Sequence, residues 1–144
     1  MNFSNDEIFF ALKVLGDEKA WGDSHLFLIE SNVKNADIIA CLMPQIHINK
    51  LFKKYEHLQN LSVTDSTSSP IKIYFSEDNW QTIPQQSGYK NIHLYRTYLI
   101  LHEFGHSIGH GHEKCPGVGH LAPVMMQQTK GTEKCLPDPW VKKI

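Results

Sequence analysis

The chain has 144 residues, of which 41% are hydrophobic and 20% are charged, and its formal net charge is −1. A chain of this length and composition can bury the core of one domain and is not a disordered or fibrous chain. It has no basic stripe and no apolar run near the roughly 18 residues of a membrane span, so we expect neither nucleic acid nor a membrane as a partner. We predict a single domain over residues 1–144, present as a monomer.

The N-terminal residues predict no secretory leader. The stretch MNFSNDEIFFALKV is acidic where a signal peptide would be basic, and it lacks a small-residue cleavage site. We therefore expect the chain to be intracellular at synthesis, unless an export signal lies outside this sequence.

The first part of the chain contains one predicted helix and two predicted strands. Residues 5–22 (NDEIFFALKVLGDEKAWG) have the spacing of an amphipathic helix, which Gly22 would end. Its predicted apolar face is made of Ile8, Leu12 and Leu15. Residues 25–31 (HLFLIES) and 36–44 (ADIIACLMP) are predicted strands, and the second has the nearly continuous apolar run of a buried strand. Residues 45–60 form either a short helix or a loop.

The next part is predicted to contain a third strand and a long helix. Residues 62–70 (SVTDSTSSP) are rich in turn-forming residues, and residues 71–77 (IKIYFSE) form the third strand. An irregular stretch leads into a helix over residues 91–108 (NIHLYRTYLILHEFGHSI). After Gly109, Gly or Pro recurs up to position 123, which predicts a mostly irregular tail. This order predicts an α+β fold with a small, mixed and twisted sheet.

Four histidines and a glutamate lie within the stretch HEFGHSIGHGH, residues 102–112. Positions i and i+4 of a helix share one face, so His102 and His106 project side by side and can bind a single Zn²⁺. Glu103, next to the first of these histidines, can reach a water at an open coordination position and act as its general base.

A third ligand must come from His110 or His112. In an unbroken helix, His110 would lie about 12 Å along the axis from His102, too far to share one ion. Gly109 offers another path, because helices commonly end with a glycine in the left-handed conformation. The chain would then turn back and bring His112 to the metal. We predict His102, His106 and His112 as ligands, with His110 in a supporting or surface position.

Two cysteines flank the Gly- and Pro-rich loop that follows the histidines. Cys115 and Cys135 could close this loop as a disulfide, whereas three reduced thiols, including Cys41, are the alternative. The sequence leaves both open. Cysteine ligands to zinc are not expected, because no CxxC pair exists.

The arrangement HExxHxxGxxH resembles that of the metzincin clan of zinc peptidases. Members of this clan also share a tight turn that carries a methionine beneath the metal, and residues 122–128 (APVMMQQ) lie where this Met-turn would fall. By this resemblance we assign Met125 to the turn, with core filling as the alternative for a methionine pair. The resemblance implies a minimal metzincin-like fold. Its upper part, residues 1–109, would hold the sheet and the active-site helix, and its lower part, residues 110–144, the third ligand and the Met-turn.

A second resemblance covers most of the chain. The stretch YRTYLILHEFGHSIGHGHEKCPGVGHLAPVMMQQTKGTEKCLPDPW is similar to a family of zinc peptidases, mostly secreted actinobacterial proteins, that is catalogued as a domain of unknown function. That family has a YR-x-Y lead-in, HExGHxxGHxH, APVMxQQT between two cysteines, and a closing NPW in which Asp138 here replaces Asn. Two departures concern the missing leader and Cys41, which lacks the upstream cysteine partner usual in the family.

These resemblances imply a zinc-dependent endopeptidase with one catalytic Zn²⁺ per chain. Glu103 would activate the zinc-bound water for attack on a peptide bond. The peptide or protein substrate would lie as an extra strand along a sheet edge, for which residues 71–77 are a candidate. The alternatives are a catalytically silent module that binds zinc or peptide, and a zinc hydrolase acting on a non-peptide amide.

Overall fold

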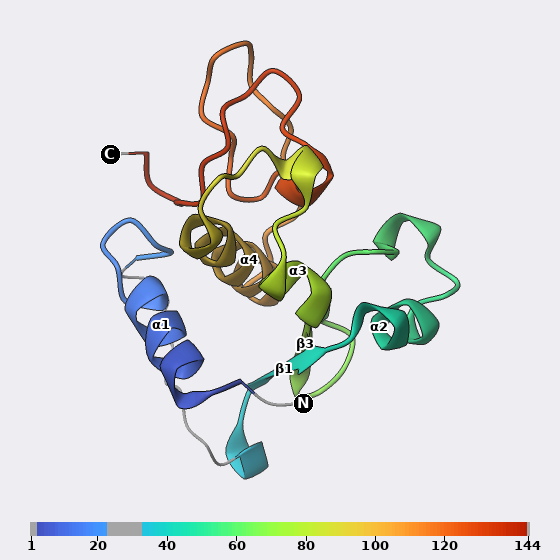
Figure 1. Cartoon of the computed structure of the whole chain (residues 1–144). Coiled ribbons are helices and arrows are strands. Elements are labelled where there is room, and N and C mark those ends of the chain that lie inside the picture. The colour runs from blue at the N-terminus through green and yellow to red at the C-terminus, as the bar shows by residue number, and fades with distance from the viewer. Residues whose placement is uncertain (1–2, 23–32, 144) are drawn as a thin grey trace.

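A computed structural model of the chain describes residues 3–22 and 33–143 (Figure 1). The described residues form an α+β domain, which confirms the predicted class: α-helices and a three-stranded mixed sheet are followed by an irregular C-terminal part. The predicted strand over residues 25–31 lies outside the described residues.

The N-terminal helix, α1, spans Asn5–Leu15 and is shorter than predicted. It begins with a capping box, in which the Ser4 hydroxyl accepts from the Glu7 amide and the Glu7 carboxylate accepts from the Ser4 amide. It ends at Gly16 because glycine is a poor helix former and the Asp17 carboxylate binds the Lys19 amide in a local turn.

The side of α1 that packs on the core differs from the predicted face. Ile8 and Leu12 are exposed, whereas Val14 is buried and Phe10 and Leu15 pack partly buried against the core. The predicted apolar face was therefore wrong for Ile8 and Leu12 and right for Leu15. Apolar residues occupy nearly every side of this helix, so their spacing does not single out the one that faces α4.

The sheet has the order β1-β3-β2, with β1 at Ile38–Met43, β2 at Val63–Asp65 and β3 at Ile71–Ser76. β1 runs parallel to β3, and β2 runs antiparallel to it. Two expectations are corrected here. Part of the stretch 62–70 is a strand rather than only turns, and residues 71–77, the candidate for the sheet edge, form the central strand, which is paired on both sides.

Helix α4, Ile92–Ser107, lies between the sheet and the C-terminal part (Figure 1). The Asn91 side chain caps its first turn by accepting from two backbone amides. Its buried side chains form one core cluster with those of β3, including Ile73 and Phe75. Two shorter helices, α2 at Gln45–Leu51 and α3 at Glu77–Gln81, follow β1 and β3, so residues 45–60 do begin with a short helix.

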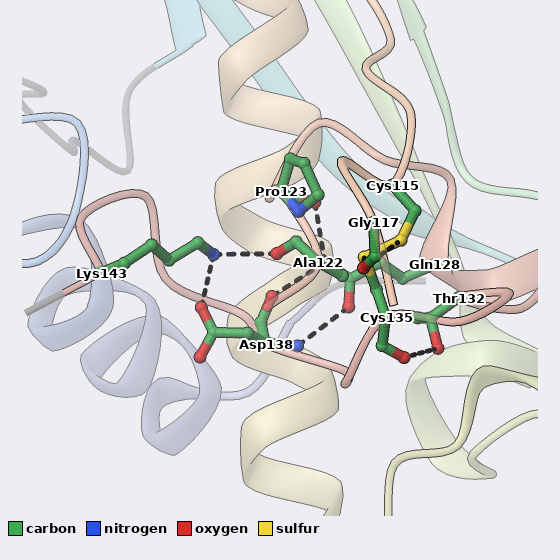
Figure 2. The surroundings of a disulfide bond; sticks show 9 residues. All are labelled: Cys115, Gly117, Ala122, Pro123, Gln128, Thr132, Cys135, Asp138 and Lys143. Carbon is green, nitrogen blue, oxygen red and sulfur yellow. Dashed lines mark hydrogen bonds and ion pairs between the residues drawn. A yellow bond between two sulfur atoms is a disulfide. The ribbon is translucent and has the colours of Figure 1, made fainter. Parts of the chain in front are cut away.

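The C-terminal part is irregular, as predicted, and is ordered by particular contacts (Figure 2). The fully buried Gln128 donates to the carbonyls of Pro123 and Asp138, at 2.9 and 2.8 Å. Its Oε1 accepts from the Tyr89 hydroxyl and from the Asp138 amide, so both donors and both lone pairs of its amide are used. Gln128 therefore ties the tail to the chain before α4. Among the described helices, none has the length and apolar character needed to cross a membrane.

Candidate metal site

The first two histidines of the cluster project from the last turns of α4, and backbone carbonyls orient their rings. His102 Nδ1 lies 2.7 Å from the Val124 carbonyl, and His106 Nδ1 lies 2.8 Å from the His110 carbonyl. Because a carbonyl can only accept, each Nδ1 carries the hydrogen, and in the neutral ring Nε2 carries the free lone pair. Each Nε2 atom thus carries the lone pair that a metal ion would bind.

Gly109 ends the helix in the way that the sequence predicts. Its φ is 99°, within the range that favours glycine. The Gly109 amide donates to the His106 carbonyl and the His110 amide to the Gly105 carbonyl, the bond pair of a Schellman motif. This motif reverses the chain, so that the residues after Gly109 return toward α4.

The reversal brings His112 to the two helical histidines. Its Nε2 lies 3.1 Å from His106 Nε2, and the ligand atoms of His102, His106 and His112 all lie within 4.8 Å of one another. Two nitrogens bound to one tetrahedral Zn²⁺ would be about 3.3 Å apart. The described residues therefore contain a group of three imidazoles that could hold a metal ion.

His110 takes another position. Its ring stacks on the Trp21 indole with the centroids 4.2 Å apart, while its carbonyl orients His106. Trp21 is in turn fixed by its Nε1 hydrogen bond to the Leu101 carbonyl of α4, at 2.8 Å. His110 thus supports the site through its backbone.

The surroundings of the three imidazoles favour their neutral form. Burial lowers the pKa of His102 to about 3, and the neighbouring His106 contributes in the same direction. Burial also lowers the pKa of His106 and of His112, and for His112 the charges of His106 and Lys130 add to the effect. The rings are thus unprotonated at neutral pH, as ligands must be.

Glu103 lies beside this group and is buried. Its Oε1 accepts a hydrogen bond of 2.8 Å from the Thr64 hydroxyl, and its Oε2 lies 3.9 Å from His102 Nε2. Burial raises the pKa of Glu103 to about 7, although the bond from Thr64 acts against this rise. A carboxyl group with such a pKa can both accept and release a proton near neutral pH.

A pocket of about 150 Å³ opens onto these side chains. It is lined by His102, Glu103, His106 and His112, by residues between 58 and 66, and by Gln127 and Thr129. The segment between 58 and 66 includes β2. The pocket therefore brings a sheet edge and the C-terminal part to the same three imidazoles.

Residues 123–126, where the Met-turn is predicted, form a tight turn in which the Met126 amide donates to the Pro123 carbonyl at 3.0 Å. Met125 is buried against Gly105 of α4. A Cβ atom at Gly105 would lie 2.6 Å from Met125 Sδ and 2.4 Å from the Trp21 ring, closer than real contacts allow. Gly105 is thus required by the packing of these two side chains.

The sequence analysis did not predict the packing role of Gly105. A signal for it existed, because a glycine inside a helix is unfavourable unless packing requires it. Thr64 was also missed, and it lies in a segment predicted to form turns. Nothing in that segment signals the contact, because Thr64 and Glu103 are 39 residues apart.

Cys115 and Cys135 are joined in a disulfide, with their Cα atoms 5.8 Å apart (Figure 2). The bond closes the loop that follows His112, and it packs with the buried Ala122 and Met126 in a small cluster of its own. Cys41 is a free thiol.

The fold and the site define a small α+β protein with a three-histidine group that could bind a metal, beside a buried glutamate. The profile of the family described as "Protein of unknown function (DUF3152)" matches residues 2–137, and the chain belongs to this family. Searches of curated proteins and of solved structures found no match.

Proposed function

We propose that the protein is a zinc-dependent endopeptidase of the metzincin type. One observation carries the proposal: the Nε2 atoms of His102, His106 and His112 converge, and the buried Glu103 carboxylate lies next to them. Three imidazoles with a neighbouring carboxylate form the donor set of a catalytic metal site rather than of a structural one, which would have four protein ligands.

Zinc suits these residues better than other metals do. Imidazole nitrogens favour Zn²⁺, whereas Mg²⁺ and Ca²⁺ prefer oxygen ligands. The carbonyls of Val124 and His110, which accept from the ligand rings, are the kind of outer partner that orients metal-binding histidines. We therefore expect one Zn²⁺ per chain, held by His102, His106 and His112.

When bound, zinc would acidify a water molecule and polarise the scissile carbonyl. Glu103 would accept the proton of the attacking water on Oε2, the oxygen that faces the histidines, and pass it to the leaving amine. Burial in the pocket keeps this carboxylate ready for proton transfer, because it raises the pKa of Glu103 to about 7.

The edge strand β2 is where we expect the substrate to bind. Within the described sheet, β2 pairs with β3 on one side only, and its residues line the pocket beside the histidines. An extended peptide could add to the free edge through main-chain hydrogen bonds and place one peptide bond at the site. This strand replaces residues 71–77 as the candidate edge.

Two further features support the metzincin type. The sheet and α4 precede Gly109, and His112 and the turn at residues 123–126 follow it, which is the order expected for the upper and lower parts of a metzincin. Met125 is buried against Gly105, the residue before His106 on α4, and a Met-turn would likewise bring a methionine close to the active-site helix.

The test compares the zinc-loaded wild type with Glu103→Ala. Both proteins are analysed for zinc and incubated with a denatured protein and a diverse peptide library, and the products are identified by mass spectrometry. We expect equal zinc contents and a turnover lower by about 10²–10⁴-fold in the variant, the usual range for a general base.

Three results would contradict the proposal. A wild type that neither contains nor takes up zinc has no metal centre of this kind. A wild type that binds zinc but cleaves no peptide, or a Glu103→Ala variant with wild-type turnover, favours a zinc-binding module or a hydrolase for another amide.

A further inference from the structure

We propose that Thr64, on the edge strand β2, is a positioning residue that aims the Glu103 carboxylate at the metal site. The inference rests on the proposed function, because it assigns Thr64 a role through Glu103. The hydrogen bond from Thr64 would then link the strand that is expected to bind substrate with the carboxylate that is expected to transfer the proton.

The hydrogen bond to Thr64 leaves the two oxygens of Glu103 unequal. Oε1 is bound to the Thr64 hydroxyl at 2.8 Å, and Oε2 is therefore turned toward His102 Nε2, at 3.9 Å. Among the described residues, Thr64 is the one hydrogen-bond donor to this carboxylate. Without it, the side chain could rotate about its last bond with little resistance, since that torsion is broad.

Thr64 is itself well placed to hold a direction. It is the middle residue of β2, and its neighbours Val63 and Asp65 pair with Tyr74 and Lys72 of β3. The β-branched side chain has few rotamers, so the hydroxyl is fixed by the strand rather than by a mobile loop. The sheet thereby controls the orientation of a side chain on α4.

A purely structural role must be separated from this one. The Thr64 hydroxyl also lies 3.1 Å from the Glu103 backbone carbonyl, so its bond could simply fasten β2 to α4. A fastening bond would affect stability alone. A positioning bond would also affect the rate of the chemical step, and it would do so only when Glu103 is present.

The experiment measures kcat and KM on a peptide that the zinc-loaded wild type cleaves. Thr64→Val removes the hydroxyl while nearly keeping the shape, and Thr64→Ser keeps the hydroxyl. We expect Thr64→Val to lower kcat by about 10- to 100-fold, the range for a misplaced reacting group. KM and zinc content should stay within about two-fold, and Thr64→Ser should recover most of the rate.

Thr97→Val is the matched control. The buried Thr97 hydroxyl donates to the His93 carbonyl on the same helix, at 2.7 Å, away from Glu103. This variant also loses a hydroxyl-to-carbonyl bond, so it should lower stability without lowering kcat. If Thr64→Val does not fold, Thr64→Ala, which adds no bulk, takes its place.

A double-mutant cycle gives the decisive result. In a Glu103→Gln background, Thr64→Val should change kcat by less than about two-fold, because the group that Thr64 positions has already lost its function. Equal losses in both backgrounds, wild-type turnover in Thr64→Val, or a Thr64→Ser variant as slow as Thr64→Val would each overturn the proposal.

Crystal structures of the wild type and Thr64→Val separate this inference from the proposed function. If the wild type binds zinc but cleaves nothing, the peptidase proposal fails. The positioning role of Thr64 is then tested only by the orientation of the Glu103 carboxylate in the two crystal structures. A rotated or split Glu103 carboxylate in Thr64→Val supports the positioning role, and an unchanged one contradicts it.

Discussion

The chain changes character at Gly109. Before this residue, α1–α4 and β1–β3 are regular elements whose buried apolar side chains form the main core cluster. After it, the described residues contain one short 3₁₀ turn, Gln128–Lys130. Val124 and Met125 of this part join the same core cluster. Its other contacts include the disulfide, the buried Gln128, and tyrosine hydroxyls of α4 that bond to residues 126–129.

The candidate site is divided between these two kinds of structure. The regular part contains His102, His106 and Glu103 on one helix. The irregular part contains His112 and the Val124 and His110 carbonyls that orient the rings of His102 and His106. Damage to a single contact should therefore matter more in the irregular part, where no repeated pattern compensates for it.

The largest effect should follow from removing the one ligand that the irregular part contributes. His112→Ala should weaken zinc binding by more than about 100-fold, beyond the 10- to 100-fold seen when only an outer partner of a ligand is lost. His110→Ala is the control and should bind zinc nearly as the wild type does, because the orienting group is its backbone carbonyl. Competition with a chromophoric chelator measures both. If His110→Ala loses the metal while His112→Ala retains it, His110 and not His112 is the third ligand.

Opening the disulfide should loosen the irregular part. Replacing Cys115 and Cys135 together by Ser should lower the free energy of unfolding by about 3 kcal/mol, because the bond spans 20 residues and restricts the unfolded chain. Cys41→Ser, in the regular part, should change it by less than about 1 kcal/mol. Denaturant unfolding of the metal-free proteins measures both values. Equal effects of the two changes would show that the loop needs no covalent closure.

In the regular part, the ionisation of buried Glu103 should make the free energy of unfolding depend on pH. Its folded pKa of about 7 lies above the ordinary value of 4.5, so between these values the folded protein holds more protons than the unfolded one. The free energy of unfolding of the metal-free protein therefore falls as pH rises through that window, because the folded state disfavours the ionised form of Glu103. Relative to the wild type, Glu103→Gln should gain up to about 3 kcal/mol between pH 4.5 and 7. A stability difference that does not vary with pH would mean that Glu103 titrates normally.

A smaller effect is expected where the two parts meet. Gly105→Ala adds a Cβ that would collide with Met125 of the irregular part and with Trp21. Overpacking of this kind typically costs about 1–3 kcal/mol, against a gain of at most about 1 kcal/mol from better helix propensity. Gly111→Ala, where a Cβ would meet open space, should be nearly neutral. Thermal unfolding compares them, and a stabilised Gly105→Ala would show that Met125 can move aside.

Features set by nearby residues could be predicted from the sequence, whereas features set by distant partners could not. The helix over residues 91–108 and the convergence of His102, His106 and His112 were foreseen, because i, i+4 spacing and a helix-ending glycine act within a few residues. The strand β2 and the central place of β3 were not foreseen. Strand pairing is decided by partners distant in sequence, and the three residues of β2 have no pattern of their own.

The sequence by itself determined the local chemistry of this protein: which helix carries the first two histidines, where that helix ends, and that a glutamate follows the first histidine. Only the tertiary structure decided which neighbours act on these groups. Thr64 meets Glu103 across 39 residues, and Trp21 meets the Leu101 carbonyl across 80. Helical periodicity is set by residues a few positions apart in the sequence, whereas such contacts depend on how the sheet and the irregular part pack against α4.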